Sequence, residues 1–170
     1  MSIRIIGAVM VVTASSAVGF GIAASHKRQT LELMQLIRAL EFMTCELEYR
    51  LTSLPELCHL TAEQVSGTVR NVFLRLEKEL QMQISADVYC CMTAALEHIE
   101  KISEPMKENF LLLGKNLGRF DLQGQLSGIT SVMHLCRRDL DGLQNNQEVR
   151  LRSYRTLGIC AGIALVILFI

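Results

Sequence analysis

The sequence contains no tryptophan, only two prolines and few aromatic residues, which make up 5% of its 170 positions. Strands favour aromatic and β-branched residues, whereas the abundant Leu, Glu, Lys, Arg, Gln, Met and Ala of this chain favour helices. The formal net charge is zero. Without an excess of basic residues, no field attracts nucleic acid or a broad anionic surface. Composition therefore predicts an all-α protein that does not bind nucleic acid.

Motifs of the familiar enzyme classes are also absent: there is no Walker-type phosphate loop, H-E-x-x-H, G-x-S-x-G or C-x-x-C. The nearest metal-ligand candidates are Cys58-His59 together with His134 and Cys136. Adjacent ligands and an H-x-C pair do not match the spacing of zinc sites. The six cysteines show no framework spacing, so we expect free thiols. We expect no enzyme activity, metal, cofactor or small-molecule substrate.

Long uncharged stretches lie at both ends of the chain. Ile5–Ser25 is long enough, at about 1.5 Å per residue, to cross a hydrocarbon core of about 30 Å as one helix. Leu157–Ile170 would span only about 21 Å, so it has to include preceding residues or sit in a thinned bilayer. We expect transmembrane helices at residues 1–25 and 156–170, with a helical domain at 26–155 between them.

Basic residues near the two stretches predict the orientation. Only Arg4 precedes the first stretch, whereas the domain side carries Lys27, Arg28, Arg150, Arg152 and Arg155. Because basic residues near spans stay in the cytosol, we expect a cell-membrane protein with a cytosolic domain and both termini outside. The alternative is a cleaved signal peptide, with small residues Gly21 and Ala23 before the cleavage site. It would make the protein an extracytoplasmic binding module held by a C-terminal tail.

The hydrophobic pattern of the domain predicts a series of helices. Leu33, Leu36, Leu40, Met43 and Leu47 recur at spacings of three and four, which is typical of an amphipathic helix. Ser53, Pro55 and Glu56 indicate a capping box that starts a second helix, and Gly67 ends that helix near Val65. Further helices are expected over residues 69–83, 85–99 with Ser85 as cap, 104–117, and from Asp121 onward.

The last of these helices carries a heptad rhythm that points toward the membrane. Its apolar positions are Leu122, Leu126, Ile129, Met133, Cys136, Leu140 and Leu143. We expect it to pair in antiparallel fashion with the first amphipathic helix, since both connect to spans on one face. Asn145 and Asn146 are an alternative breaking point. The predicted fold is an antiparallel bundle of about six helices whose long first and last members continue into the spans.

Two groups of residues are candidates for contacts with partners. Glu41, Glu46 and Glu48 form an acidic group on the first helix, interpreted either as a solvated face or as a docking surface for a basic partner. Small residues in the spans allow close helix packing: Ser15, Gly19 and Ala23 in the first, Gly158 and Gly162 in the second. These stripes would pack on each other, on a second copy in a homo-oligomer, or on a different membrane protein.

Along its whole length the chain resembles the stage III sporulation protein AB family. The matching segments are Ile6-Gly7-Ala8, Gly19-Phe20, Met43 to Arg50 followed by Ser53-Leu54, Leu117-Gly118, Asp121 with Gln125 and Ile129, and Tyr154 to Gly158 with Gly162. Arg50 and Ser53 stand where the family prefers glycine and proline, and the family's tryptophan in the fourth helix is missing.

The resemblance implies a non-enzymatic platform or scaffold in the channel between mother cell and forespore, required for endospore formation. Its domain would be similar to that of the inner-membrane platform protein of type II secretion and type IV pilus systems. The implied partners are a secretion-type ATPase, the stage III sporulation protein AA, and other membrane proteins of the channel in the outer forespore membrane. Tyr49, in the matching turn, joins the acidic group as a docking candidate.

Overall fold

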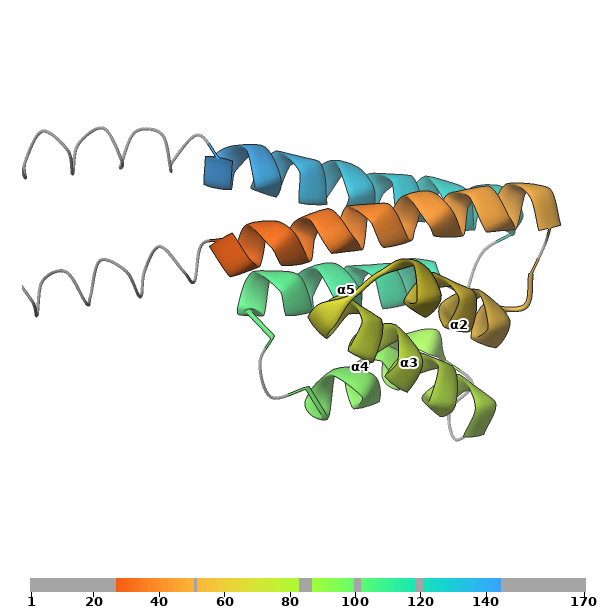
Figure 1. Ribbon diagram of the computed structural model, residues 1–170. Helices are drawn as coiled ribbons and strands as arrows, with labels where there is room; N and C mark the ends of the chain where they lie inside the picture. The colour runs from red at the N-terminus through yellow and green to blue at the C-terminus, as the bar shows by residue number, and fades with distance from the viewer. Residues whose placement is uncertain (1–26, 51, 83–86, 100–101, 119–120, 145–170) are drawn as a thin grey trace, which may run out of the picture.

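The computed structural model describes residues 27–50, 52–82, 87–99, 102–118 and 121–144. Four of its helices are labelled in Figure 1: α2 (Leu54–Gln64), α3 (Gly67–Met82), α4 (Val88–Glu97) and α5 (Glu104–Asn116). Two longer helices occupy residues 27–50 and 122–144. These described ranges hold no strand, so the prediction of an all-helical bundle with about six helices is confirmed for them.

The two long helices lie side by side and run in opposite directions, with residues 27 and 144 at the same end of the bundle (Figure 1). Arg137 Nη2 lies 2.7 Å from Glu41 Oε1 and joins them. The antiparallel pairing predicted from the sequence is therefore confirmed. The alternative break at Asn145 and Asn146 lies outside the described residues.

Across the described ranges, no helix is both long and apolar enough to traverse a bilayer. The two stretches expected to do so, residues 1–25 and 156–170, lie outside these ranges. All six described helices fall within the predicted domain of residues 26–155.

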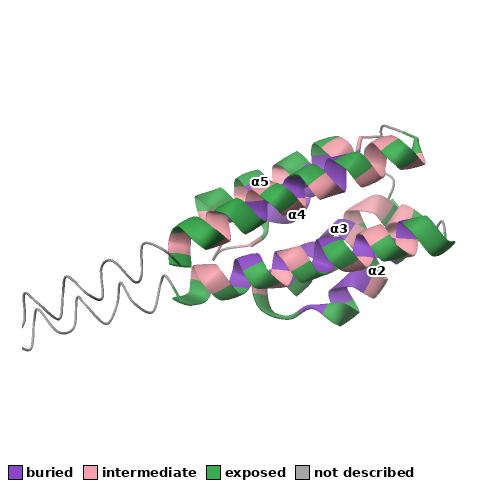
Figure 2. Ribbon diagram, turned by 90° about the horizontal axis from the view of Figure 1, so that it is seen from above, coloured by how far each residue is buried: buried purple, intermediate pink, exposed green. Residues whose placement is uncertain are grey.

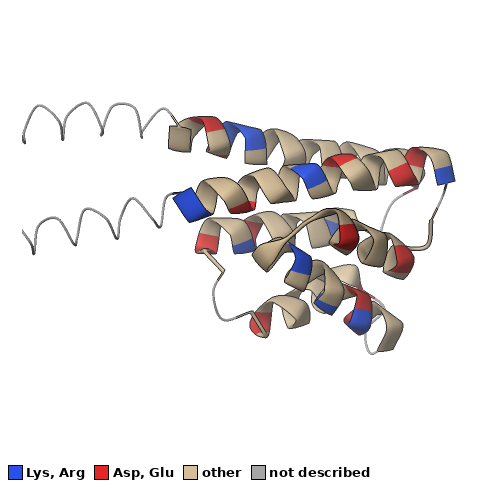
Figure 3. Cartoon of the chain, viewed as in Figure 1, with Lys and Arg blue, Asp and Glu red and all other residues tan. Residues whose placement is uncertain are grey.

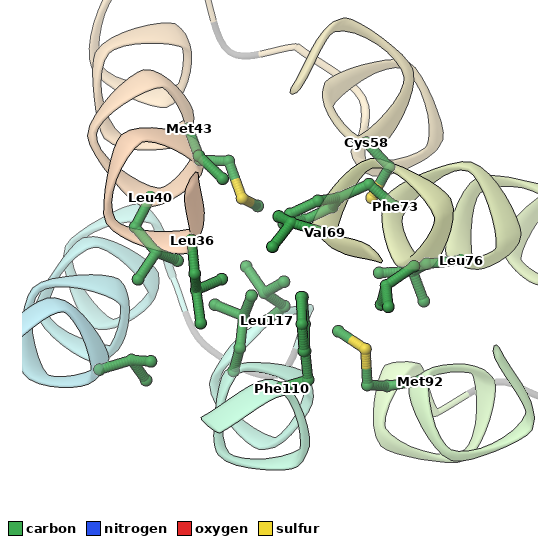
Figure 4. Close-up of a cluster of buried hydrophobic side chains, with 14 of the residues drawn as sticks. Leu36, Leu40, Met43, Cys58, Val69, Phe73, Leu76, Met92, Phe110 and Leu117 are labelled. Atoms are coloured by element: carbon green, nitrogen blue, oxygen red, sulfur yellow. The ribbon is translucent and has the colours of Figure 1, made fainter. Parts of the chain in front are cut away.

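One continuous core fills the space between the helices. Each helix presents a stripe of buried residues to the interior and exposed residues on its other side (Figure 2). The five apolar residues predicted to line the first helix are all buried. Side chains from four helices and from Leu117 converge at the centre (Figure 4): Leu36, Leu40, Met43, Val69, Phe73, Leu76, Met92 and Phe110. Each such burial stabilises the fold by about 1.5–3 kcal/mol, which explains why the helices hold together.

The N-terminus of α2 lies where the sequence predicted, but the serine side chain does not cap it. Pro55 occupies the first turn, and the backbone N–H of Leu57 donates to the carbonyl oxygen of Ser53 at 2.8 Å. The Ser53 side chain makes no capping hydrogen bond, so the predicted capping box is wrong. Proline already sets the helical φ and removes one N–H that would need a partner, so the helix start does not depend on the serine hydroxyl.

The cap of α4 also differs from the prediction. The backbone N–H of Tyr89 donates to Asp87 Oδ1 at 3.2 Å, which makes Asp87 the N-cap. Ser85 lies outside the described residues. Aspartate is as good a cap as serine, and its charge also favours the positive end of the helix dipole.

Two glycines end helical segments as the sequence predicted. Gly67 has a φ of 68° at the turn between α2 and α3, and Gly118 has a φ of 76° just after α5. Both values lie in the left-handed region, which side chains with a Cβ adopt at a cost. These turns reverse the chain and bring α3 back along α2, and the last helix back along α5.

Candidate interaction site

The far end of helix 27–50 presents the most exposed aromatic side chain of the described chain. Tyr49 is 80% exposed, and its neighbours Glu48 and Arg50 are exposed as well. This end lies opposite to residues 27 and 144 (Figure 1). Tyrosine is among the residue types that are enriched in the anchors of protein interfaces. We call Glu48 and Tyr49 the tip pair.

Glu41 and Glu46 are bound to partners within the domain. Glu41 pairs with Arg137 of the last helix. Glu46 is only 12% exposed, lies 3.8 Å from Arg50, and accepts a hydrogen bond from the Thr52 hydroxyl at 3.4 Å. The acidic residues therefore differ: Glu46 is largely covered, Glu41 is exposed but paired with Arg137, and Glu48 is exposed. Charges of both signs follow one another along this helix (Figure 3). The docking role of the acidic group stays a prediction, and we carry it forward for the tip pair.

A polar cluster holds the other end of the same helix against the turn between α2 and α3. Glu32 is buried and accepts from Arg28 Nε at 3.0 Å and from the Thr68 hydroxyl at 2.8 Å. One turn further on, Gln35 Oε1 accepts from the backbone N–H of Ser66 at 3.1 Å. Both donors reach Oε1, and a buried carboxylate that accepts a guanidinium N–H and a hydroxyl keeps its charge at a lower cost than an unpaired one. The cluster fixes how helix 27–50 sits on α2 and α3.

Sequence reasoning did not find this cluster. Its partners lie 36 and 31 residues apart along the chain. Only the Arg28–Glu32 pair leaves a local signal, the i, i+4 spacing of opposite charges on a helix. Nothing in a single sequence marks Thr68 as the third member.

His59 joins α2 to α3. Its Nδ1 lies 3.0 Å from Glu77 Oε2, and its Nε2 lies 3.7 Å from Glu63. The hydrogen bond with Glu77 raises the pKa of His59 above its ordinary value, because the carboxylate favours the protonated ring. His59 is therefore turned toward carboxylates, and does not pair with Cys58 as a metal site would require.

The buried thiols of Cys58 and Cys136 offer no ready nucleophile or metal ligand. Burial raises the pKa of Cys58 far above its ordinary value and that of Cys136 to about 12, so both stay protonated at neutral pH. The five described cysteines form no disulfide. Within the described ranges, no three His, Cys, Asp or Glu side chains gather as a metal site would need.

A shallow groove runs between α5 and helix 122–144, and sequence reasoning missed it. It is lined on one side by Asn109 and Leu112 and on the other by Leu135 and Arg138. Asn109 is 2% exposed, and its Nδ2 has no hydrogen-bond partner among the described residues. An unpaired buried amide of this kind costs about 1–3 kcal/mol.

The five small residues expected to pack within the membrane, Ser15, Gly19, Ala23, Gly158 and Gly162, all lie outside the described residues. Their packing stays a prediction.

Comparison with known proteins gives one consistent result. The family model described as stage III sporulation protein AB matches residues 4–170. The stage III sporulation protein AB of Bacillus subtilis (strain 168) is 25% identical over 173 residues, which covers 98% of each chain. A solved structure of a stage III sporulation protein AB has the same fold, with a TM-score of 0.61 and 19% identity. It covers 72% of this chain and 98% of the solved one.

Proposed function

Because the chain belongs to the stage III sporulation protein AB family, we propose that it is a non-enzymatic scaffold of the channel between mother cell and forespore in endospore formation. Its helical domain docks the secretion-type ATPase, stage III sporulation protein AA. The observation that carries the proposal is the antiparallel pair of long helices, because residues 27 and 144 lie at one end of the bundle. Along the chain these ends lead toward the two hydrophobic stretches, which supports a domain that projects to one side of a membrane.

The proposed place is the outer forespore membrane, with the domain in the mother-cell cytosol. The basic residues that flank the hydrophobic stretches on the domain side support this orientation. The bundle carries the tip pair at the end farthest from residues 27 and 144, where a cytosolic ATPase can reach it. A rigid packed core between tip and membrane suits a part that transmits or resists force.

Labelling of native cysteines tests the orientation. Cys45 and Cys90 are exposed on the domain, whereas Cys58, Cys91 and Cys136 are buried. A membrane-impermeant thiol reagent should therefore leave Cys45 and Cys90 unmodified in intact protoplasts and modify them after lysis. Modification in intact protoplasts would place the domain outside, and would support the extracytoplasmic binding module instead.

Changing the tip pair tests the docking. We expect the double variant Glu48→Lys and Tyr49→Ala to bind the ATPase at least about tenfold more weakly, because interface anchors of this kind contribute more than 1–2 kcal/mol. The affinity of the full chain in lipid nanodiscs for the purified ATPase measures the change. Glu46 is left unchanged, because a lysine there would face Arg50 within the domain.

The matched control reverses the charge at one exposed carboxylate and shortens one exposed apolar side chain, both away from the tip pair. Glu97→Lys with Met82→Ala meets this description, since Met82 is 63% exposed and Glu97 is exposed at the end of α4. If both double variants bind equally, the tip pair is a solvated surface and the docking site lies elsewhere.

We also propose that the small residues of the spans pack against other membrane proteins of the channel. Replacing Gly158 and Gly162 with leucine would separate the helix backbones, since close approach in lipid depends on small side chains. We expect about tenfold less of the other channel proteins to co-purify with the variant, while its ATPase affinity stays as in the unchanged chain. Undiminished co-purification would mean that this face of the span contacts lipid.

A further inference from the structure

A hollow of ≈ 310 Å³ lies between α3 and the carboxyl end of α4, away from the two long helices. It is lined by Asn71, Leu74, Arg75, Lys78, His98 and Ile99. The four residues from α3 are related by spacings of three, four and seven, apart from the neighbours Leu74 and Arg75, so they lie on one side of that helix. His98 and Ile99 close the hollow from the end of α4.

Every charged side chain that lines the hollow is basic, although the chain as a whole is neutral. Among the described residues, neither Arg75 nor Lys78 lies within 4.0 Å of a carboxylate, whereas Arg28, Arg50 and Arg137 each pair with one. These two cations therefore line the hollow without an ion pair to any described residue.

Neither of the carboxylates nearest in sequence, Glu77 and Glu79, lines the hollow. Glu77 binds His59 on the side of α2. The charge of Glu79 acts on the Cys91 thiol, whose pKa it helps to raise after the larger effect of burial. The carboxyl end of α4 adds only about half a negative charge, which the two full charges of Arg75 and Lys78 outweigh.

We propose that this hollow binds a phosphate group. A guanidinium supplies a planar fork of donors that matches phosphate oxygens, and an ammonium supplies a point charge with three further donors. The Asn71 amide and an N–H of the His98 ring complete a set of donors around one volume. The half-buried Leu74 and Ile99 reduce water access beneath the ligand, and this strengthens each charged hydrogen bond.

The phosphate can come from a lipid headgroup or from a soluble phosphate compound, and one experiment distinguishes them. The full chain is placed in nanodiscs of uncharged phosphatidylcholine, with its histidines ¹⁵N-labelled, and is titrated with pyrophosphate at constant ionic strength. We expect the ring resonances of His98 to shift and saturate, while those of His59 and His134 stay in place. The unchanged histidines of the same molecule are an internal control.

Variants make the result specific. Arg75→Gln with Lys78→Gln should weaken pyrophosphate binding at least about tenfold, because two charged hydrogen-bond donors are lost. Arg38→Gln with Lys107→Gln removes one arginine and one lysine outside the hollow, and should leave the affinity unchanged. Equal weakening by both double variants would reduce the effect to general electrostatics and overturn the proposal.

The lipid composition then identifies the source. If nanodiscs with anionic phosphatidylglycerol shift the His98 resonances without pyrophosphate, the headgroup is the ligand. If the shift still requires pyrophosphate, a soluble phosphate compound is the ligand. Absence of a saturable shift with either source overturns the proposal, and saturation by a glutamate-rich peptide alone would make the hollow a contact for an acidic protein segment.

Discussion

Replacing Phe110 with alanine should lower the free energy of unfolding of the bundle by about 3–5 kcal/mol, the usual cost of removing a buried aromatic ring. Phe110 is completely buried on α5, near the middle of the converging side chains in Figure 4. Its ring meets that of Phe73 edge-on, with centroids 5.8 Å apart and planes at 70°. Alanine would remove this contact and leave a cavity that rigid helices on several sides cannot close.

The buried Cys58 thiol gives a measurement that works on the full chain in nanodiscs. A thiol reagent reaches Cys58 only when the core opens, so its modification rate under native conditions reports the free energy of opening. We expect Phe110→Ala to raise that rate by about 100-fold or more, since each 1.4 kcal/mol is a factor of ten.

An exposed residue gives the control for this measurement. Met82→Ala shortens a side chain that is 63% exposed, and should change the opening free energy by less than about 0.5 kcal/mol. If Phe110→Ala opens no more readily than Met82→Ala, the ring does not hold the core together.

Helix positions and the core were predictable because they depend on local and periodic signals. Proline and glycine mark chain breaks by their own backbone geometry, and α2 was expected over Leu54–Val65 and found over Leu54–Gln64. The spacing of apolar residues identified the buried faces of both long helices. Their antiparallel pairing followed from the two hydrophobic ends of the chain.

Capping and long-range polar contacts were not predictable from the same signals. Ser53 and Asp87 are both good capping residues, and which one caps through its side chain depends on backbone geometry that sequence spacing does not fix. Glu46 and Glu48 are only two residues apart, yet one faces Thr52 and the other faces solvent. A 200° turn of the helix separates them, so a cluster in sequence is not a cluster in space.

The basic hollow was missed for a related reason. The spacing of the four α3 residues that line the hollow places them on one side of a helix, but cations on such a helix face are usually solvated. Only the fold brings the end of α4 over Arg75 and Lys78, while Glu77 binds His59 instead. Glu48 entered the docking prediction through the acidic group and Tyr49 through the segment that matches the family, and the exposure of Tyr49 at the end of helix 27–50 was not deducible from the apolar pattern.

Replacing Gly118 with alanine should destabilise the bundle by about 2–5 kcal/mol, for two separable reasons. Its φ of 76° lies in the left-handed region, which costs an alanine about 1–2 kcal/mol. A Cβ at this position would also lie 2.5 Å from Val88 Cγ2, on a β-branched side chain at the start of α4. Moving a side chain with so little rotamer freedom adds an overpacking cost of about 1–3 kcal/mol.

Gly67 separates these two costs within the same protein. Its φ of 68° is nearly the same, but a Cβ there would meet nothing within 4 Å. Gly67→Ala should therefore show the backbone cost alone, about 1–2 kcal/mol in the Cys58 modification assay. The difference in opening free energy between Gly118→Ala and Gly67→Ala measures how tightly the turn after α5 packs against α4. Equal destabilisation would mean that Val88 yields freely, so that backbone geometry alone requires glycine at the end of α5.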